Sequence, residues 1–299
     1  MNAPTLEKVV VIGVGLIGGS FALALKSAGA VATVVGVGRG APNLDTARRM
    51  GIATRTWTLD QRWTDELGDA DLVLISTPVG QMPALFSRIA PALGSNTVLT
   101  DAGSTKQDVV AAARRYLGAA FSRFVPGHPI AGTEHSGAAA ASDALFRGKS
   151  VVLTPLTETA ADAQARVAAA WAYCGGIVGV LDPVRHDQIF AAVSHLPHAL
   201  AFALVAQLAR RADAGDYFCY AASGFRDFTR LASSDPEMWR DICLANASAL
   251  RTELSAYRSE LDRLDALLAA ADGSGLAALF ERARESRNTW LADHRGDRD

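Results

Sequence analysis

Cysteine is scarce in this sequence, with only three among 299 residues, at positions 174, 219 and 243. An odd, widely spaced set argues against a disulfide framework and a cysteine-rich metal site, and it suits a reducing compartment. An excess of one charge is also lacking, since 29 lysines and arginines balance 31 aspartates and glutamates, for a net charge of −2. This balance gives no reason to expect a nucleic acid or an anionic membrane as a partner.

Long apolar runs are lacking as well. No run reaches the ~20 uninterrupted apolar residues of a membrane span without glycines or polar breaks, so we expect a soluble, cytoplasmic protein with no membrane partner. The 49% apolar and 20% charged residues are ordinary for a globular protein. The length predicts about two domains of ~150 residues each.

A glycine-rich stretch follows the first apolar segment. Val9–Ile12 is typical of a strand, Gly13, Gly15 and Gly18 follow in the order G-x-G-x-x-G, and Phe21–Lys26 favours a helix. In a dinucleotide site the first glycine allows the tight turn, the second lets the backbone approach a pyrophosphate, and the third lets the helix pack on the strand. Because a strand and a helix flank the motif, it predicts a dinucleotide-binding domain.

The first turn of this helix and the end of the second strand predict further cofactor contacts. Leu16 and Ile17 lie in the first turn, whose unpaired N–H groups and helix dipole face the phosphates. After the second strand, Ala32–Val37, an acidic residue usually binds the 2′-hydroxyl of NAD, whereas an arginine accommodates the 2′-phosphate of NADP. Here the acid is absent and Arg39 is present, which favours NADP. The alternative is a solvated arginine with NAD bound through other groups.

Apolar strands then alternate with helices up to residue 181. This alternation predicts an α/β fold with a Rossmann-like, doubly wound, mostly parallel sheet. Ligands of such sheets bind outside the carboxyl ends of the strands, so we expect Thr77, Pro78 and Asp101 to contact the cofactor. The further strands are expected at 71–76, 97–101, 123–125, 150–154 and 176–181.

From residue 182 onward the sequence shows only helical runs, at 184–193, 198–211, 238–268 and 276–292. We therefore predict a nucleotide-binding domain at 1–181 and an all-helical substrate and dimerisation domain at 182–299. Residues 199–209 are apolar on nearly every face, which predicts burial on all sides. A small domain achieves that by packing on a second subunit, so we predict a homodimer.

His128 is the first candidate for catalysis. It follows an expected strand and lies among Gly127, Pro129 and Gly132, a stiff setting of small residues that fixes a side chain. Histidine is the side chain whose unperturbed pKa, ~6.5, makes it a base at neutral pH. The alternative is a loop histidine that makes only a local hydrogen bond.

A second cluster is Ser194-His195-Leu-Pro197-His198. Ser194 is a plausible N-cap for a helix with Pro197 in its first turn. His195 and His198 lie three residues apart without nearby carboxylates or cysteines, which is too weak for zinc, and we expect no metal. Contact with a substrate and hydrogen bonds between helices remain as alternatives.

A third cluster contains Arg226, Asp227 and Arg230. A guanidinium fork is the natural receptor for a carboxylate. The alternative is an ion-paired surface helix, which contributes little. Trp239, near the start of the next helix, is more often a core residue than a ligand contact.

Together these motifs resemble one family. GVGLIGGS, STPV, DAGSTK, GHPIAGTEHSG, SHLPH and GFRDFTRLASSDPEMWRDI are similar to the prephenate/arogenate dehydrogenases of tyrosine biosynthesis, from residue 9 to about 245. The resemblance implies a nucleotide-binding domain followed by a helical dimerisation domain. It also implies oxidative decarboxylation of prephenate to 4-hydroxyphenylpyruvate with NAD(P). Arogenate as the substrate, or both compounds, is the alternative.

The resemblance also implies roles for single residues. His128 accepts the proton of the substrate 4-hydroxyl, and Ser104 holds the same hydroxyl and helps to orient the histidine. Arg230 binds a substrate carboxylate, and His198 contacts the substrate. The other residues of the pocket rim and its ion network are Thr133, Glu134, Ser194, Arg226, Asp227 and Trp239.

Two other classes of function are weighed against this one. A dehydrogenase of the 3-hydroxy acid or imine reductase type would need a catalytic lysine in the helical domain, but all four lysines lie before residue 182. A non-catalytic dinucleotide sensor would bind the cofactor without turning over prephenate or arogenate. We expect no added regulatory domain in this chain.

Replacing Arg39 tests the cofactor preference. Arg39→Ala is expected to weaken the binding of NADP but not of NAD, because only NADP carries the 2′-phosphate that the guanidinium would bind. Titration of each cofactor, followed by tryptophan fluorescence, measures the two affinities. Equal losses for both cofactors would contradict the NADP preference.

Overall fold

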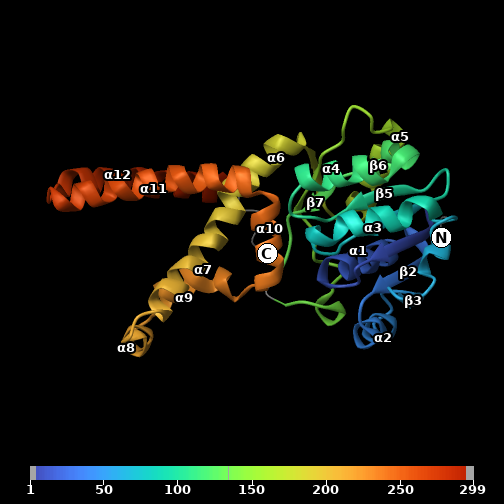
Figure 1. Cartoon of the computed structure of the whole chain (residues 1–299), viewed down its shortest axis with the longest axis horizontal. Coiled ribbons are helices and arrows are strands. Elements are labelled where there is room, and N and C mark those ends of the chain that lie inside the picture. Colours follow the sequence, from blue (N-terminus) through green and yellow to red (C-terminus); the bar gives the residue numbers. More distant parts are fainter. Residues whose placement is uncertain (1–4, 134, 294–299) are drawn as a thin grey trace. The chain divides into compact units, whose positions relative to one another are not determined.

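The computed structural model describes residues 5–133 and 135–293 (Figure 1). By its internal contacts the chain divides into two compact units, Met1–Asn246 and Ala247–Asp299. The change from strands to helices near residue 182 therefore lies inside the first unit.

Six parallel strands form the main sheet of the first unit (Figure 1). They are β1 (Leu6–Ile12), β2 (Val31–Gly38), β3 (Arg55–Thr58), β4 (Leu72–Ile75), β5 (Val98–Asp101) and β6 (Phe124–Val125). Their order is β3-β2-β1-β4-β5-β6, with Val10 of β1 between Val35 and Val73. This doubly wound order confirms the predicted fold class. β3, a short edge strand of mixed polarity, was not predicted from the sequence.

Helices cover both faces of this sheet, which explains the apolar runs of its central strands, such as Val9–Ile12 of β1 and Leu72–Ile75 of β4. Val9 and Val11 belong to one apolar core, with α1 and α5, whereas Val10 and Ile12 belong to the other, with α3 and α4. Successive side chains of a strand point to opposite faces, so one strand contributes to both cores. The helices are α1 (Leu16–Ser27), α2 (Ala41–Arg49), α3 (Met82–Ile89), α4 (Gln107–Tyr116) and α5 (Ala161–Tyr173).

A second, three-stranded sheet was not expected. It consists of β7 (Gly127–Pro129), β8 (Ser150–Leu153) and β9 (Ile177–Val180), with β7 antiparallel to β8. The predictions that β8 and β9 extend the main sheet and that His128 lies in a loop are therefore wrong. The N–H of Gly127 donates to the Asp101 carboxylate, and His128 then pairs with Val152, so the chain leaves the main sheet after β6.

One continuous helical segment follows the second sheet. It comprises α6 (Pro183–Phe190), a π-helical turn at Ala191–His195, and α7 (Leu196–Ala209). Ser194 therefore lies inside the helical segment, and the expectation that it is an N-cap is wrong. A proline inside a helix removes one backbone hydrogen bond and crowds the preceding turn, and the wide π turn ends at His195, two residues before Pro197.

Two further expectations concern the same segment. Pro183–Ala209 is long and apolar enough to cross a membrane by length and composition, although only 28% of its most apolar window is buried inside the structure. Within α7 only Leu196 and Ala201 are buried, so a single chain does not enclose this helix on all sides. The buried charged and polar residues of the segment, including Asp187 and His195, face protein.

The remaining helices are shorter in the first unit and long in the second. Residues 238–268 were expected as one run, but Asn246 separates α10 from α11. The helices are α8 (Ala214–Cys219), α9 (Ser223–Thr229) and α10 (Pro236–Ala245), then α11 (Ala247–Ala269) and α12 (Gly273–Asp293) in the second unit. Short 3₁₀ turns span Trp63–Glu66, Val79–Gln81, Ala90–Ala92, Gly118–Arg123, Ala138–Ala140 and Arg230–Ser233.

A pair of glycine variants tests the packing of the first βα turn. A Cβ atom at Gly18 would collide with the Ser76 hydroxyl and the Gly13 carbonyl, so Gly18→Ala is expected to lower the free energy of unfolding by about 1–3 kcal/mol. Gly15 has φ of −108° and no neighbour within 4 Å of such an atom, so Gly15→Ala is the matched control. Urea unfolding followed by circular dichroism measures both. Equal stability of the two variants would contradict this account.

Candidate active site

The loop between β1 and α1 is shaped for a phosphate group. Gly13 has φ of +101°, and a Cβ atom there would lie 2.6 Å from the Ser76 carbonyl oxygen. Gly15 faces open space, and no side chain caps the turn that contains Leu16 and Ile17. A close backbone approach and free N–H groups at a helix N-terminus fit a dinucleotide pyrophosphate.

Other predicted cofactor residues lie at neighbouring strand ends. Arg39 is exposed after β2. Thr77 and Pro78 follow β4, and the Thr77 hydroxyl is buried without a hydrogen-bond partner among the described residues. A buried polar atom without a protein partner is expected to bind a ligand or water. These positions fit a nucleotide along the carboxyl edge of the sheet.

Asp101 makes hydrogen bonds to the loops beside this edge of the sheet. Its carboxylate is fully buried, accepts hydrogen bonds from the N–H groups of Gly103 and Gly127, and pairs with the Lys106 ammonium. Lys106 Nζ also donates to the Gly127 carbonyl oxygen at 2.7 Å. The Asp101 side chain is thus committed to holding the β5 exit loop, which contains Ser104, against β7.

His128 contacts the helical segment from its place on β7. Its Nδ1 lies 2.9 Å from Nε2 of His186, and its ring packs against Phe190 with centroids 4.7 Å apart. Burial lowers the pKa of His128 well below 6.5, and the nearby His186, Lys106 and His195 lower it further. His128 is therefore neutral at pH 7.

His186 and Asp187 lie behind His128 on α6. His186 Nδ1 is 2.8 Å from Asp187 Oδ1, and both side chains are buried. The same carboxylate accepts the backbone N–H groups of Lys106 at 2.8 Å and Gln107 at 2.9 Å. Burial raises the pKa of Asp187, but the hydrogen bonds from His186 and these two N–H groups outweigh it and hold the pKa below its usual value.

His195 lies deeper in the same cluster. Asn246 Nδ2 is 3.1 Å from His195 Nδ1 and donates to the Asp187 carbonyl oxygen at 2.7 Å. An amide NH₂ group only donates, so Nδ1 of His195 accepts and Nε2 carries the hydrogen. That Nε2 is buried beside the backbone of Ser104. Burial lowers the pKa of His195 to about 4.

His198 is held between Ser194 and Trp239. Its Nδ1 donates to the Ser194 carbonyl oxygen at 2.9 Å, and its ring stacks on Trp239 with centroids 3.6 Å apart. Burial lowers the pKa of His198, and the charge of Arg230 lowers it further. Trp239 is buried, and Arg230 is exposed next to this pair.

The other predicted pocket residues are peripheral in a single chain. Thr133, Arg226 and Asp227 are exposed, and Ser104 is half-buried. Glu134 lies outside the described residues. The sequence analysis did not select His186, Asp187 or Asn246. An adjacent base and acid, His186 and Asp187, in a largely apolar helical run could have indicated a functional pair. Nothing in the sequence around Asn246 indicates its role.

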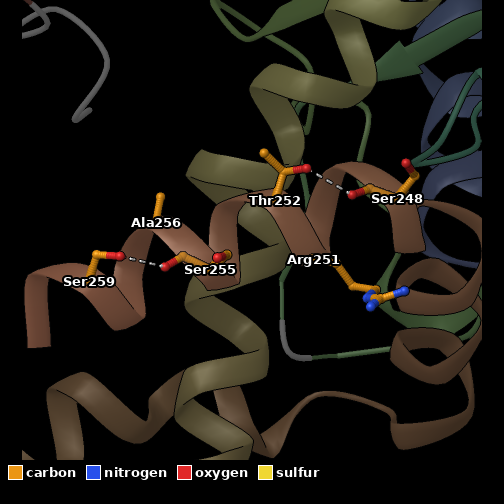
Figure 2. A pocket seen from close by; sticks show the side chains of 6 residues that line it. All are labelled: Ser248, Arg251, Thr252, Ser255, Ala256 and Ser259. Carbon is orange, nitrogen blue, oxygen red and sulfur yellow. Dashed lines mark hydrogen bonds between the residues drawn. The ribbon is translucent and has the colours of Figure 1, made fainter. Parts of the chain in front are cut away.

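Two hollows lie away from these residues. A hollow of about 530 Å³ runs along α11, lined by Ser248, Arg251, Thr252, Ser255, Ala256 and Ser259 (Figure 2). Its Thr252 and Ser259 hydroxyls bond back to their own helix, at Ser248 and Ser255. A second hollow of about 300 Å³ lies between Leu6 and Tyr173. Among the described residues no group of three or more His, Cys, Asp or Glu side chains is arranged to hold a metal.

Comparison with protein families identifies the chain. Residues 21–180 match the nucleotide-binding domain of prephenate dehydrogenase, and residues 182–282 match its dimerization domain. The chain belongs to the prephenate dehydrogenase family. This result confirms the resemblance inferred from the sequence motifs and the dinucleotide-binding class of the first domain.

Individual relatives of the family agree. The cyclohexadienyl dehydrogenase of Zymomonas mobilis is 34% identical over 290 residues, which cover 96% of this chain and 97% of that protein. The crystal structure of prephenate dehydrogenase from Aquifex aeolicus, with hydroxyphenyl propionate and NAD+, has a TM-score of 0.89 and 35% identity, covering 95% and 98%. The arogenate dehydrogenase of Synechocystis has a TM-score of 0.79 and 28% identity, covering 95% and 99%.

The buried, neutral His195 predicts a pH dependence of stability. Its pKa is about 4 in the folded chain against 6.5 in the reference state, so the unfolded chain binds more protons between these values. The stability this provides is complete above pH 6.5 and decreases as the pH falls toward 4. Between pH 7.5 and pH 5, His195→Gln is expected to lose about 2 kcal/mol less free energy of unfolding than the parent protein. Urea unfolding at both pH values measures this, and parallel losses would contradict it.

Proposed function

We propose that this chain catalyses the NAD(P)-dependent oxidative decarboxylation of prephenate to 4-hydroxyphenylpyruvate. The observation that supports this best is a neutral, fixed His128 at the carboxyl edge of the nucleotide-binding sheet, in a chain with both domains of the family. The relatives named above for prephenate, cyclohexadienyl and arogenate dehydrogenases support the same reaction class.

His128 is the proton acceptor in this proposal. The substrate 4-hydroxyl donates a hydrogen bond to His128. Its proton moves to the imidazole ring of His128 as the substrate carbon that bears the hydroxyl becomes a carbonyl. An oxidised nicotinamide held by the β1–α1 loop would supply the hydride acceptor for that carbon, and loss of the ring carboxylate as CO2 would make the product aromatic. A neutral imidazole suits this position because it neither repels the cationic nicotinamide nor needs to lose a proton first. Ser104, in the β5 exit loop, is proposed to hold the same hydroxyl.

The helical part of the first unit is proposed to bind the substrate carboxylates. Arg230 offers an exposed guanidinium beside His198, and His198 is fixed by its stack on Trp239 and its bond to Ser194. A dianionic substrate requires such a cation. Thr133, Glu134, Ser194, Arg226 and Asp227 are proposed to complete the rim and its ion network.

The cofactor is proposed to be NADP rather than NAD. Gly13, Gly15, Leu16, Ile17 and Gly18 would hold the pyrophosphate in either case, and Thr77, Pro78 and the Asp101 loop would line the nicotinamide end. Arg39 is exposed after β2, where a 2′-phosphate would lie, and no acid takes its place.

A homodimer formed through residues 182–299, separate from a nucleotide-binding domain at 1–181, is also proposed. In one chain the helical part leaves large apolar side chains exposed, including Val193 at 66%, Tyr220 at 87% and Leu244 at 69%. Such surfaces mark association sites. Light scattering across dilution should give twice the chain mass, and a monomer throughout would contradict the proposal. A cytoplasmic location stays a prediction.

Arogenate is the second candidate substrate. It carries an amino group where prephenate carries a keto group, and a carboxylate such as Asp227 or Glu134 would favour an ammonium. A relative named cyclohexadienyl dehydrogenase favours the use of both compounds. Cofactor binding without turnover of either would instead favour a dinucleotide sensor.

A two-by-two assay tests the function. Prephenate or arogenate is combined with NAD or NADP, and formation of the reduced nicotinamide is followed by absorbance. His128→Asn is expected to lower kcat by about 10²-fold or more, because it removes the proton acceptor. The exposed His135 gives a control, His135→Asn, which should leave kcat near the parent value. Unchanged kcat in His128→Asn would refute the proposed role.

A further inference from the structure

Two buried residues behind His128 have no role in the reaction proposed so far. His186 and Asp187 are 0% and 1% exposed, and they form a chain of contacts that runs from His128 to the start of α4. Neither residue belongs to a motif that the sequence analysis selected. The hydrogen bonds they make allow the position of each proton in the chain to be derived.

Asp187 only accepts hydrogen bonds. Its oxygens receive the N–H groups of Lys106 and Gln107 and the Gln107 side-chain amide at 3.1 Å, all of which are donors. As an ionised carboxylate it also accepts from His186, so His186 Nδ1 carries a hydrogen. Burial lowers the pKa of His186, although the bond to Asp187 opposes this, so its ring is neutral and its Nε2 is bare.

The same logic then fixes His128. A bare Nε2 on His186 accepts a hydrogen bond, so His128 Nδ1, at 2.9 Å, carries the hydrogen. His128 is also neutral, and a neutral imidazole has one hydrogen only. Its free lone pair is therefore on Nε2, at the edge of the ring remote from His186.

We propose that His186 and Asp187 are positioning residues that hold His128 in the Nδ1–H tautomer, with Nε2 as the proton acceptor, and that Asp187 stabilises the imidazolium formed. This inference rests on the proposed role of His128. The hydroxyl proton moves to Nε2, no other bond changes in the relay, and the positive charge of His128 is met through the Nδ1–H···Nε2 bond of His186 and the carboxylate of Asp187. As the ring carboxylate leaves as CO2, its bonding electrons make the 4-oxygen a phenolate, which takes the proton back from His128 Nε2 and leaves His128 neutral again.

The arrangement resolves a conflict of charges around His128. The groups that face it are His186 on α6, His195 in the π turn and Lys106 before α4. His186 and His195 are neutral, so Lys106 is the cation of the three that, together with burial, opposes a positive charge on the ring. The carboxylate of Asp101 is already paired with Lys106. Asp187 is therefore the anion left to compensate His128 when it is protonated. Because Asp187 contacts His186 and is separated from His128 by the His186 ring, its charge does not protonate His128 in the resting enzyme.

The first test uses the tautomers and needs no turnover. Two-bond ¹H–¹⁵N spectra of the full chain labelled with [¹⁵N]histidine distinguish Nδ1–H from Nε2–H rings, and His128→Asn assigns the signals of His128. The Nδ1–H form of both His128 and His186 at pH 7 is expected. An Nε2–H form of His128, or a charged ring, overturns the inference whether or not the enzyme assignment holds.

The second test uses kinetics. Asp187→Asn is expected to lower kcat by about 10–100-fold, as for other residues that orient a reactive group through hydrogen bonds. The acid limb of the kcat/KM profile should move to lower pH, because the imidazolium loses its anion and the pKa of His128 falls. A merely structural role would lower activity without moving this limb.

Matched variants separate the relay from helix anchoring. Asp182→Asn weakens the N-cap of the same helix, where Asp182 accepts the N–H groups of Val184 and Arg185, and it should leave the pH profile unchanged. His186→Gln keeps an acceptor for His128 and should retain more activity than His186→Phe, which removes it. These two variants test the proposal even if Asp187→Asn fails to fold. Equal activity of His186→Gln and His186→Phe, or an unmoved acid limb in a folded Asp187→Asn, overturns it. Full activity of His128→Asn would instead refute the function.

Discussion

The buried carboxylate of Asp187 is the interaction on which the active-site geometry depends. It belongs to α6, yet it accepts the first N–H groups of α4, so it joins the helical segment to the carboxyl edge of the sheet. Removing one partner from a buried charged network leaves other groups unpaired, which costs more than the bond itself contributes. The position of His186, and through it of His128, follows from this junction.

A second buried charge pair gives the site its electrostatic character. Lys106 and Asp101 are both fully buried and neutralise each other beside β7. The ammonium remains close enough to His128 to disfavour a second cation, and burial acts in the same direction. A resting site with neutral histidines and an exposed arginine at its edge is suited to an anionic substrate and a cationic nicotinamide together.

The sequence was sufficient for features that depend on local backbone chemistry. The tight turn at Gly13 and the close packing of the helix on the strand at Gly18 follow from glycine spacing, and the structure confirms both. Features that depend on distant partners could not be predicted. The role of His186 cannot be predicted from its own helix, because it depends on the hydrogen bonds of Asp187 to the start of α4. The end of α10 likewise depends on the hydrogen bonds of Asn246 to His195 and to the Asp187 carbonyl oxygen. The antiparallel return of β7 likewise depends on the Gly127 contact with Asp101.

The segment Pro183–Ala209 has a buried polar side and an exposed apolar side. Its inward side chains, His186, Asp187 and His195, are buried in the polar cluster, whereas Val184 and Val193 are 49% and 66% exposed. Exposed apolar surfaces of this kind mark association sites. The exposed valines and the buried polar cluster belong to one helical segment, so a partner bound to the outer side would also restrain the inner side. The apolar faces of α7 that were expected to be buried stay largely exposed in one chain, because a sequence pattern does not distinguish burial inside one chain from burial against a second subunit.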